Sequence, residues 1–195
     1  MNINIQFLQQ QNSYPDGYEL QNACGAFCIK YWHWHSGRED SQTVNQEKTI
    51  LDTYNHIKFG DNGIKYDIPP DWGNPFEICR QCGGAFFFDI RDSFIAPLSK
   101  TIREKITDIP IVESELTLEI GQYAILLLRS KQSPQHYVLA YRKSAHEYYC
   151  HDPSAPHPIL LKNGFPKLGD YVSCYELKYM GAGILLPSKS VKIHG

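Results

Sequence analysis

The apolar positions of the chain are spaced for helices in its first half and for strands in its second half. The run 24–35 is rich in small and apolar residues, contains no proline and is followed by Gly37, which predicts a largely buried helix. Its β-branched and aromatic residues would also suit a strand. A second helix is expected around residues 41–56. It precedes a stretch rich in Gly, Asp and Pro that predicts surface loops.

Both ends of a third helix are marked between Asn74 and Gly83. Asn74 can accept a hydrogen bond from a first-turn N–H, Pro75 suits the first helical position, and Glu77 stands at the position of a capping box. Gly83 suits the left-handed conformation that commonly ends a helix. The sequence therefore predicts a short helix over 75–82.

Alternating or continuous apolar runs mark the strands, most of which come late in the chain. They are expected at residues 3–7, 85–90, 122–129, 136–142, 147–152, 172–179 and 182–186. A further helix is expected near 97–107. Helices that come mostly first and antiparallel strands that come last indicate the α+β class. A length of 195 residues without a repeat or linker suits one domain over residues 1–195.

The strands 136–142 and 147–152 are close enough in sequence to form an antiparallel hairpin. If its turn centres on Ser144, Tyr141 pairs with Glu147 and His136 lies directly opposite Asp152. Opposed side chains share a face, with Cβ atoms about 4.5–5.5 Å apart, so the carboxylate could accept a hydrogen bond from the imidazole Nδ1–H. A slip by one residue would bring His151 into the place of Asp152.

Cys24 is the nucleophile that such a base could serve. It stands at the expected N-terminus of the first helix, where the helix dipole and free N–H groups lower a thiol pKa and favour the reactive thiolate. Cys28, one helical turn further on, is the alternative nucleophile. We expect Cys24 to attack, His136 to act as its base and Asp152 to orient the imidazole.

Composition and charge argue against several classes of function. A formal charge of −2 leaves no basic footprint for a nucleic acid, and the longest apolar stretch is far shorter than the roughly 20 residues of a membrane-spanning helix. The first residues lack the pattern of a signal peptide. We therefore expect a protein that is cytoplasmic or delivered by a route that needs no signal peptide. Its six cysteines are expected to be reduced thiols.

Three segments carry a resemblance to a known family. They are Cys24-Gly25-Ala26-Phe27-Cys28, His136-Tyr137-Val138-Leu139-Ala140-Tyr141 and Tyr148-Tyr149-Cys150-His151-Asp152-Pro153-Ser154. They resemble the motifs of papain-like cysteine peptidases, in particular the C39 and C39-like peptidases, and residues 74–83 are similar to the helix between those motifs. The resemblance covers most of the chain. It implies a papain-like fold with N-terminal helices packed on a C-terminal antiparallel sheet, a Cys–His–Asp triad and amide-bond cleavage, as in removal of bacteriocin leader peptides.

One position departs from the pattern of this family. Its members usually carry a glutamine six residues before the nucleophile, as the second donor to the oxyanion, whereas Tyr18 stands there in this chain. Gln11, Gln21 and Asn22 are the candidates for this donor. Gln11 is favoured because the residues that lead to it resemble the strand-then-glutamine entry of the family.

Cys79 and Cys82 have the C-x-x-C spacing of a zinc knuckle or a redox pair, and His33 and His35 could supply further ligands. The chain has no second C-x-x-C, and two cysteines on a short helix are typical of one buried and one exposed thiol. We therefore expect no metal and no cofactor, with both histidines serving in packing.

The expected function is hydrolysis of peptide bonds in a protein or peptide substrate, through a thioester on Cys24. The same triad could instead deamidate a glutamine side chain or transfer an acyl group, as papain-like toxins and injected bacterial effectors do. A non-enzymatic binding module that has kept the fold is the alternative from another class. No nucleic acid or membrane is expected as a partner.

Overall fold

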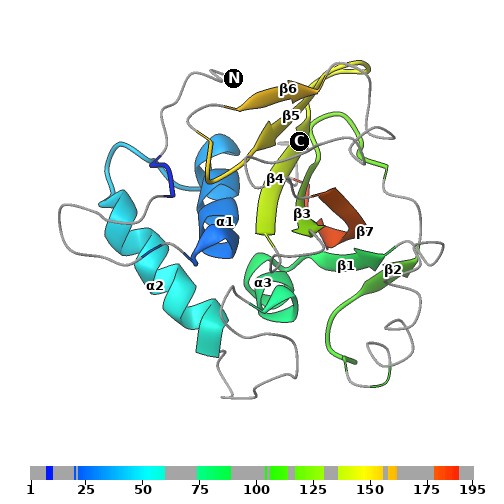
Figure 1. Cartoon of the computed structure of the whole chain (residues 1–195), viewed down its shortest axis with the longest axis horizontal. Helices are drawn as coiled ribbons and strands as arrows, with labels where there is room; N and C mark the ends of the chain where they lie inside the picture. Colours follow the sequence, from blue (N-terminus) through cyan, green and yellow to red (C-terminus); the bar gives the residue numbers. More distant parts are fainter. Residues whose placement is uncertain are drawn as a thin grey trace, which may run out of the picture.

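The computed structural model describes residues 8–10, 20, 22–59, 74–88, 104, 106–113, 117–129, 136–155, 158–161 and 178–188. Within these residues the chain forms three helices and one seven-stranded sheet (Figure 1). The helices are α1 (Cys24–His35), α2 (Gln46–Phe59) and α3 (Pro75–Cys82). The strands are β1 (Ala85–Phe88), β2 (Ile111–Glu113), β3 (Tyr123–Arg129), β4 (His136–Arg142), β5 (Tyr148–His151), β6 (Ile159–Leu161) and β7 (Lys178–Leu185).

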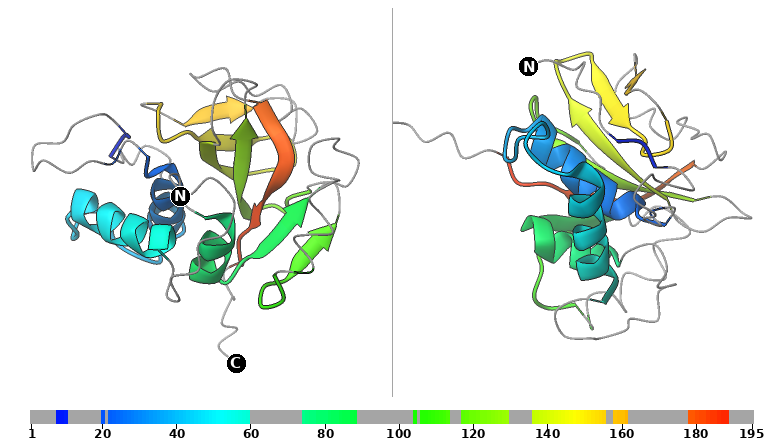
Figure 2. Two further views of the ribbon diagram at one scale, coloured as in Figure 1. Left: turned by 60° about the horizontal axis from the view of Figure 1, so that its bottom comes forward. Right: turned by 90° about the vertical axis from the view of Figure 1, so that its left-hand side faces the viewer.

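The helices gather on one side of the sheet, as both views in Figure 2 show. The strands follow the order β2-β1-β7-β3-β4-β5-β6. α1 is the central helix, because it packs against β3 and β4 as well as against α2 and α3. α3 contacts β1 and β7. This arrangement confirms the α+β class.

One edge of the sheet corrects the expectation of a wholly antiparallel sheet. β1 and β2 run parallel, whereas the other neighbouring strands run antiparallel. A parallel pair needs a connection of about a dozen residues or more. Residues 89–110 between β1 and β2 provide that length, so the sheet is mixed.

Burial on every side holds α1 in place. Eleven of its 12 residues are buried, which is typical of a helix in the core and confirms the helix predicted at 24–35. Gly25 allows α3 to lie close, because a Cβ at this position would be 2.7 Å from Cδ1 of Ile78. The packing of its neighbours therefore fixes where the amino end of α1 lies.

A side-chain cap decides where α2 begins. Asn45 Oδ1 accepts a hydrogen bond from the N–H of Lys48 at 2.9 Å, so the helix starts at Gln46. The helix expected around residues 41–56 is present, but it begins at Gln46 and continues to Phe59.

The caps predicted for α3 are confirmed. Asn74 Oδ1 accepts from the N–H of Phe76 at 2.9 Å, and Gly83 adopts the left-handed conformation with φ of 60°. The Glu77 carboxylate, expected to close a capping box, pairs with the guanidinium of Arg80 one turn further along.

β4 and β5 form the predicted hairpin in a register shifted by two residues. Tyr141 pairs with Tyr149, so the predicted pairing with Glu147 is wrong. Glu147 belongs to the turn, where its carbonyl accepts from the N–H of Lys143 at 2.9 Å. The predicted turn was therefore too short. Because side chains alternate with a period of two, this shift leaves each one on its predicted face.

β7 is a single strand where two were expected. It runs from Lys178 to Leu185 through Gly181, whose φ is 76°. Its pairing with β3 changes register between Leu126 and Leu128. A bulge at the glycine therefore bends the strand without ending it.

Several other predicted elements can be compared only in part. β1 and β3 confirm the strands expected from residues 85 and 122, although 89–90 lie outside the described residues. The strand expected at 3–7 and residues 172–177 also lie outside them. Of the helix expected near 97–107, Glu104 is helical, whereas 106–107 are not helical and the other residues are not described.

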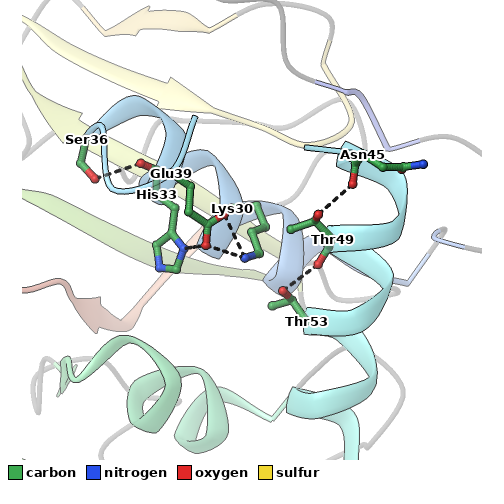
Figure 3. Close-up of polar contacts among 7 residues, drawn as sticks. All are labelled: Lys30, His33, Ser36, Glu39, Asn45, Thr49 and Thr53. Carbon is green, nitrogen blue, oxygen red and sulfur yellow. Dashed lines mark hydrogen bonds and ion pairs between the residues drawn. The ribbon is translucent and has the colours of Figure 1, made fainter. Parts of the chain in front are cut away.

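An ion-pair network connects α1 to the chain that follows it (Figure 3). The Glu39 carboxylate accepts from Lys30 Nζ at 2.9 Å and lies 2.8 Å from His33 Nδ1. Lys30 is only 9% exposed, so the carboxylate gives its largely buried charge a partner. His33 therefore takes part in this ion-pair network, in the structural role that the sequence predicted. On α2, the hydroxyls of Thr49 and Thr53 donate to carbonyls one turn earlier.

His35 lies buried between α1 and the sheet. Its Nδ1 is 2.6 Å from the Tyr123 hydroxyl, and its ring meets those of Tyr141 and His151 edge to face, with centroids 5.1 and 5.6 Å away. Burial lowers the pKa of His35 to about 4. Burial, with the nearby charge of His35, lowers the pKa of His151 to about 3. Both imidazoles are therefore neutral at pH 7.

The lowered pKa values of His35 and His151 predict that the fold loses stability in acid. In the unfolded chain both imidazoles titrate near 6.5, so below that pH the unfolded state binds more protons than the folded state. The free energy of unfolding should therefore fall as the pH drops from 6.5 towards 4. We expect a loss of about 2 kcal/mol per histidine at about pH 5, measured by urea unfolding against a reference at about pH 7.5.

Replacement of one member of the pair isolates this effect. His35→Gln should reduce the dependence of stability on pH, whereas His146→Gln, in the exposed hairpin turn, should leave it unchanged. An unchanged pH dependence in His35→Gln would contradict the assignment.

Candidate active site

Cys24 is the first residue of α1 and is completely buried. Ala23 occupies the N-cap position without a side-chain cap, and the first backbone bond of the helix runs from the N–H of Phe27 to the Ala23 carbonyl. The N–H groups of Cys24 and the next two residues therefore have no acceptor from an N-cap side chain. The thiol lies at a helix end where the dipole favours negative charge.

His136 opens β4, and Asp152 directly follows the last residue of β5. His136 Nε2 lies 2.7 Å from Asp152 Oδ1, and each residue is only 2% exposed. The structure thus brings together the two residues that the hairpin pattern paired. A short hydrogen bond between a buried imidazole and a buried carboxylate is one of the strong charge-assisted contacts.

The contact forms through a different nitrogen and a different register from those predicted. With the register shifted by two, Asp152 lies diagonally across from His136 and not directly opposite it. Diagonal neighbours are separated by about 7–8 Å, so the carboxylate meets the outer nitrogen, Nε2, and the prediction of Nδ1 is wrong. His151 packs against the ring of Tyr31 on α1, with centroids 5.7 Å apart.

The turn after β5 fixes the Asp152 carboxylate. Its Oδ1 also accepts from the N–H of Ser154 at 2.9 Å, and the main-chain carbonyl of Asp152 accepts from the N–H of Ala155 at 2.9 Å. Pro153, between them, restricts the backbone further. The hydrogen bonds within this turn therefore orient the carboxylate independently of its contact with His136.

Hydrogen bonds and charge raise the pKa of His136 to about 10. Burial acts to lower this pKa, but hydrogen bonds to Asp152 and Cys24, together with the negative charge of both groups, exceed the effect of burial. Because Nε2 is directed at Asp152, Nδ1 is the nitrogen left for the Cys24 thiol. The three predicted residues therefore form one chain of hydrogen bonds.

Cys28, the alternative nucleophile, lies one turn along α1 and is also completely buried. Burial raises the pKa of the Cys28 thiol well above its ordinary value, and negative charge at Cys24, Cys150 and Asp152 raises it further. A thiol held in its protonated form is a poor nucleophile. The environment of Cys28 therefore favours a core residue.

The expected oxyanion donors are only partly described. Gln11 and Gln21 lie outside the described residues, whereas Asn22 is half-buried two residues before Cys24. Sequence reasoning did not find the contact that residues 8–10 make with the turn after Asp152, where the N–H of Gln10 donates to a main-chain carbonyl. No local pattern could have indicated a contact between segments so far apart in the chain.

The C-x-x-C pair lies on α3, and both thiols are buried rather than one buried and one exposed. Burial raises the pKa of Cys82 to about 12. Cys24, Cys28, Cys79, Cys82 and Cys150 are free thiols. Within the described part of the chain, no group of three or more His, Cys, Asp or Glu side chains is placed to hold a metal ion.

No protein-family model matches this chain, and no curated protein matches it. Among the helices that the structure describes, none has the length and apolar character needed to cross a membrane. A function must therefore be inferred from the arrangement of the side chains themselves.

Asp152→Ala should lower the pKa of His136. The substitution removes a hydrogen bond and a negative charge while burial continues to oppose the imidazolium, so we expect a fall of about 1–3 units. NMR titration of histidine ring nitrogens measures it directly. Because the folded pKa exceeds 6.5, the wild-type contact stabilises the fold fully below pH 6.5, and this contribution is lost as the pH rises through about 10.

A second aspartate provides the matched control. Asp52 is exposed on α2 and paired with Lys48. The substitution Asp52→Ala should leave the pKa of His136 unchanged. A wild-type His136 that titrates near 6.5 would contradict the assigned contact.

Proposed function

We propose that this protein is a papain-like cysteine hydrolase that cleaves amide bonds in a protein or peptide. The observation that carries the proposal is the buried 2.7 Å contact from His136 Nε2 to Asp152 Oδ1, with Cys24 hydrogen-bonded to the same imidazole. A nucleophile, a base and a residue that orients the base are thereby joined in one network.

At neutral pH the His136 imidazole, with a pKa of about 10, already carries the proton that it shares with Cys24. In the first half of the proposed reaction, the Cys24 sulfur attacks the substrate carbonyl carbon. The tetrahedral intermediate collapses as the C–N bond breaks, and His136 returns the proton to the departing amine. This leaves an acyl group on Cys24 as a thioester. In the second half, His136 takes a proton from water, the oxygen attacks the thioester, and the thiol is regenerated with release of the acid.

Asp152 serves this sequence by holding the imidazole in one orientation. Its carboxylate accepts from Nε2, which keeps Nδ1 available for the proton that moves between Cys24 and the substrate. The same negative charge stabilises the imidazolium that forms when Cys24 gives up its proton.

The amino end of α1 supports stabilisation of the oxyanion. The backbone N–H of Cys24 and the positive end of the helix dipole lie next to the sulfur that would carry the tetrahedral intermediate. Of the three candidates for the second donor, Gln11, Gln21 and Asn22, it is Asn22, two residues earlier, that belongs to the described residues. The N–H of Cys24 is fixed by the helix, so it needs no reorganisation during the reaction.

The complete burial of Cys24 favours a second candidate substrate for the same chemistry. A glutamine side chain carries its carboxamide at the end of a slender aliphatic chain, so it can reach a recessed sulfur where a main-chain peptide bond meets more steric hindrance. Deamidation would follow the same thioester route and release ammonia in place of a peptide amine.

Alkylation tests the proposed nucleophile. We expect iodoacetamide to modify Cys24 in the folded protein at neutral pH, with a rate that falls at least about tenfold in His136→Ala. Peptide mapping by mass spectrometry identifies the modified residue. Cys28→Ala, the matched cysteine variant, should keep the Cys24 reaction, and an unreactive Cys24 in the folded wild type would overturn the proposal.

Product analysis separates the two substrates. Incubation with unfolded casein should yield shorter chains if main-chain bonds are cleaved, whereas deamidation should leave the chain whole and add about one dalton per modified glutamine. Cys24→Ala should abolish either product. Products that persist in Cys24→Ala would show that the activity does not belong to this site.

A further inference from the structure

Residues 8–10 lie between the helices and the turn that carries Asp152. On the helical side, the N–H of Leu8 donates to Gln46 Oε1 on α2 at 2.9 Å. The carbonyl of Leu8 accepts from the Tyr31 hydroxyl on α1 at 2.6 Å. The segment is therefore held at one end by α1 and α2, which pack against each other.

At its other end the segment holds the turn after β5. The N–H of Gln10 donates to the Pro153 carbonyl at 2.7 Å. The side-chain amide of Gln9 donates through Nε2 to the Ser154 carbonyl at 2.8 Å. Two hydrogen bonds thus hold consecutive carbonyls of a turn that lies 145 residues away from Gln9.

This turn determines where the Asp152 carboxylate points. The N–H of Ser154 donates to Asp152 Oδ1, the oxygen that also accepts from His136 Nε2. The side-chain amide of Gln9 donates to the main-chain carbonyl of the same residue, Ser154. A displacement of Ser154 would therefore move the donor that aims the carboxylate at the imidazole.

We propose that residues 8–10 act as a strap that positions Asp152, with Gln9 as a positioning residue for the triad. The strap bridges the helical side, which carries Cys24, and the sheet side, which carries His136 and Asp152. Gln9 acts through Ser154 on Asp152. This inference rests on the proposed function, because it assigns Gln9 a role in the proposed Cys24–His136–Asp152 triad.

The test compares two substitutions of Gln9 with a matched control. Gln9→Ala removes the whole side chain, and Gln9→Glu keeps its shape but replaces the N–H donor by a carboxylate oxygen. Gln122→Ala removes another glutamine that bonds to the backbone, through Oε1 to the N–H of Glu119. Gln122 precedes the end of β3 that lies away from His136, so its loss should not affect the triad.

The first measurement is the pKa of His136, by NMR of its ring nitrogens. Both Gln9 variants should lower this pKa, because a loosened turn weakens the hydrogen bond from Nε2 to Asp152, while Gln122→Ala should match the wild type. A His136 pKa equal to that of the wild type in folded Gln9→Ala and Gln9→Glu would overturn the proposal. If Gln9→Ala does not fold, Gln9→Glu and Tyr31→Phe carry the same test, because Tyr31→Phe removes the hydrogen bond to the Leu8 carbonyl at the other end of the strap.

The second measurement is the rate of Cys24 alkylation in a double-mutant cycle. Gln9→Ala should slow the reaction about twofold to tenfold, the equivalent of one net hydrogen bond. Added to Asp152→Ala, it should slow the reaction no further, because Gln9 acts only through that carboxylate. Losses that multiply would show a general structural role and contradict the proposal.

The two measurements distinguish failure of the strap from failure of the enzyme. A wild-type Cys24 that resists alkylation would overturn the proposed function, yet the His136 titration would still show whether Gln9 positions Asp152. A reactive Cys24 combined with an unaffected His136 in the Gln9 variants would overturn the strap alone.

Discussion

The buried hydrogen bond between His136 and Asp152 is the constraint on which the candidate site depends. Both side chains are buried away from water, where a charged group without a partner would destabilise the fold. The hydrogen bond gives each of them that partner. The contact with Asp152 raises the pKa of His136 against the effect of burial, and the hydrogen bond to Cys24 raises it further. The fold therefore holds an imidazole whose protonated form is stabilised on both sides.

The architecture brings the third member of the site to this pair. α1 is buried along nearly its whole length and packs against β4, the strand that His136 begins. Its first residue, Cys24, is consequently fixed by the packing of the whole helix and not by a loop. A sulfur on a rigid helix end and an imidazole on a rigid strand end can keep their relative geometry through a reaction.

Local signals in the sequence were sufficient for α1 and α3 and for the faces of the hairpin strands β4 and β5. Asn74 and Gly83 marked both ends of α3 because caps depend on residues within one turn. The hairpin was predicted, but not its register, since the role of Glu147 in the turn leaves no mark in the apolar pattern. The pairing of His136 with Asp152 survived because a shift by two residues keeps each side chain on its face.

Contacts between distant segments could not be predicted in this way. The bond from Gln9 to Ser154 joins residues 145 positions apart, and neither residue carries a local signal of it. The choice of Nε2 over Nδ1 depends on the end of β5 and on the diagonal approach of Asp152, which no spacing rule contains. The continuity of β7 depends on the positive φ of Gly181, a position that the sequence pattern marked as a break.

The central claim is that Cys24, His136 and Asp152 work as one proton-transfer unit. The most direct test is the Cys24 alkylation rate at neutral pH in His136→Ala, Asp152→Ala and the double variant. If Asp152 acts only through the imidazole, the double variant should react as slowly as His136→Ala alone. Losses that multiply in the double variant would contradict the account, because they would show that the two residues act independently on Cys24.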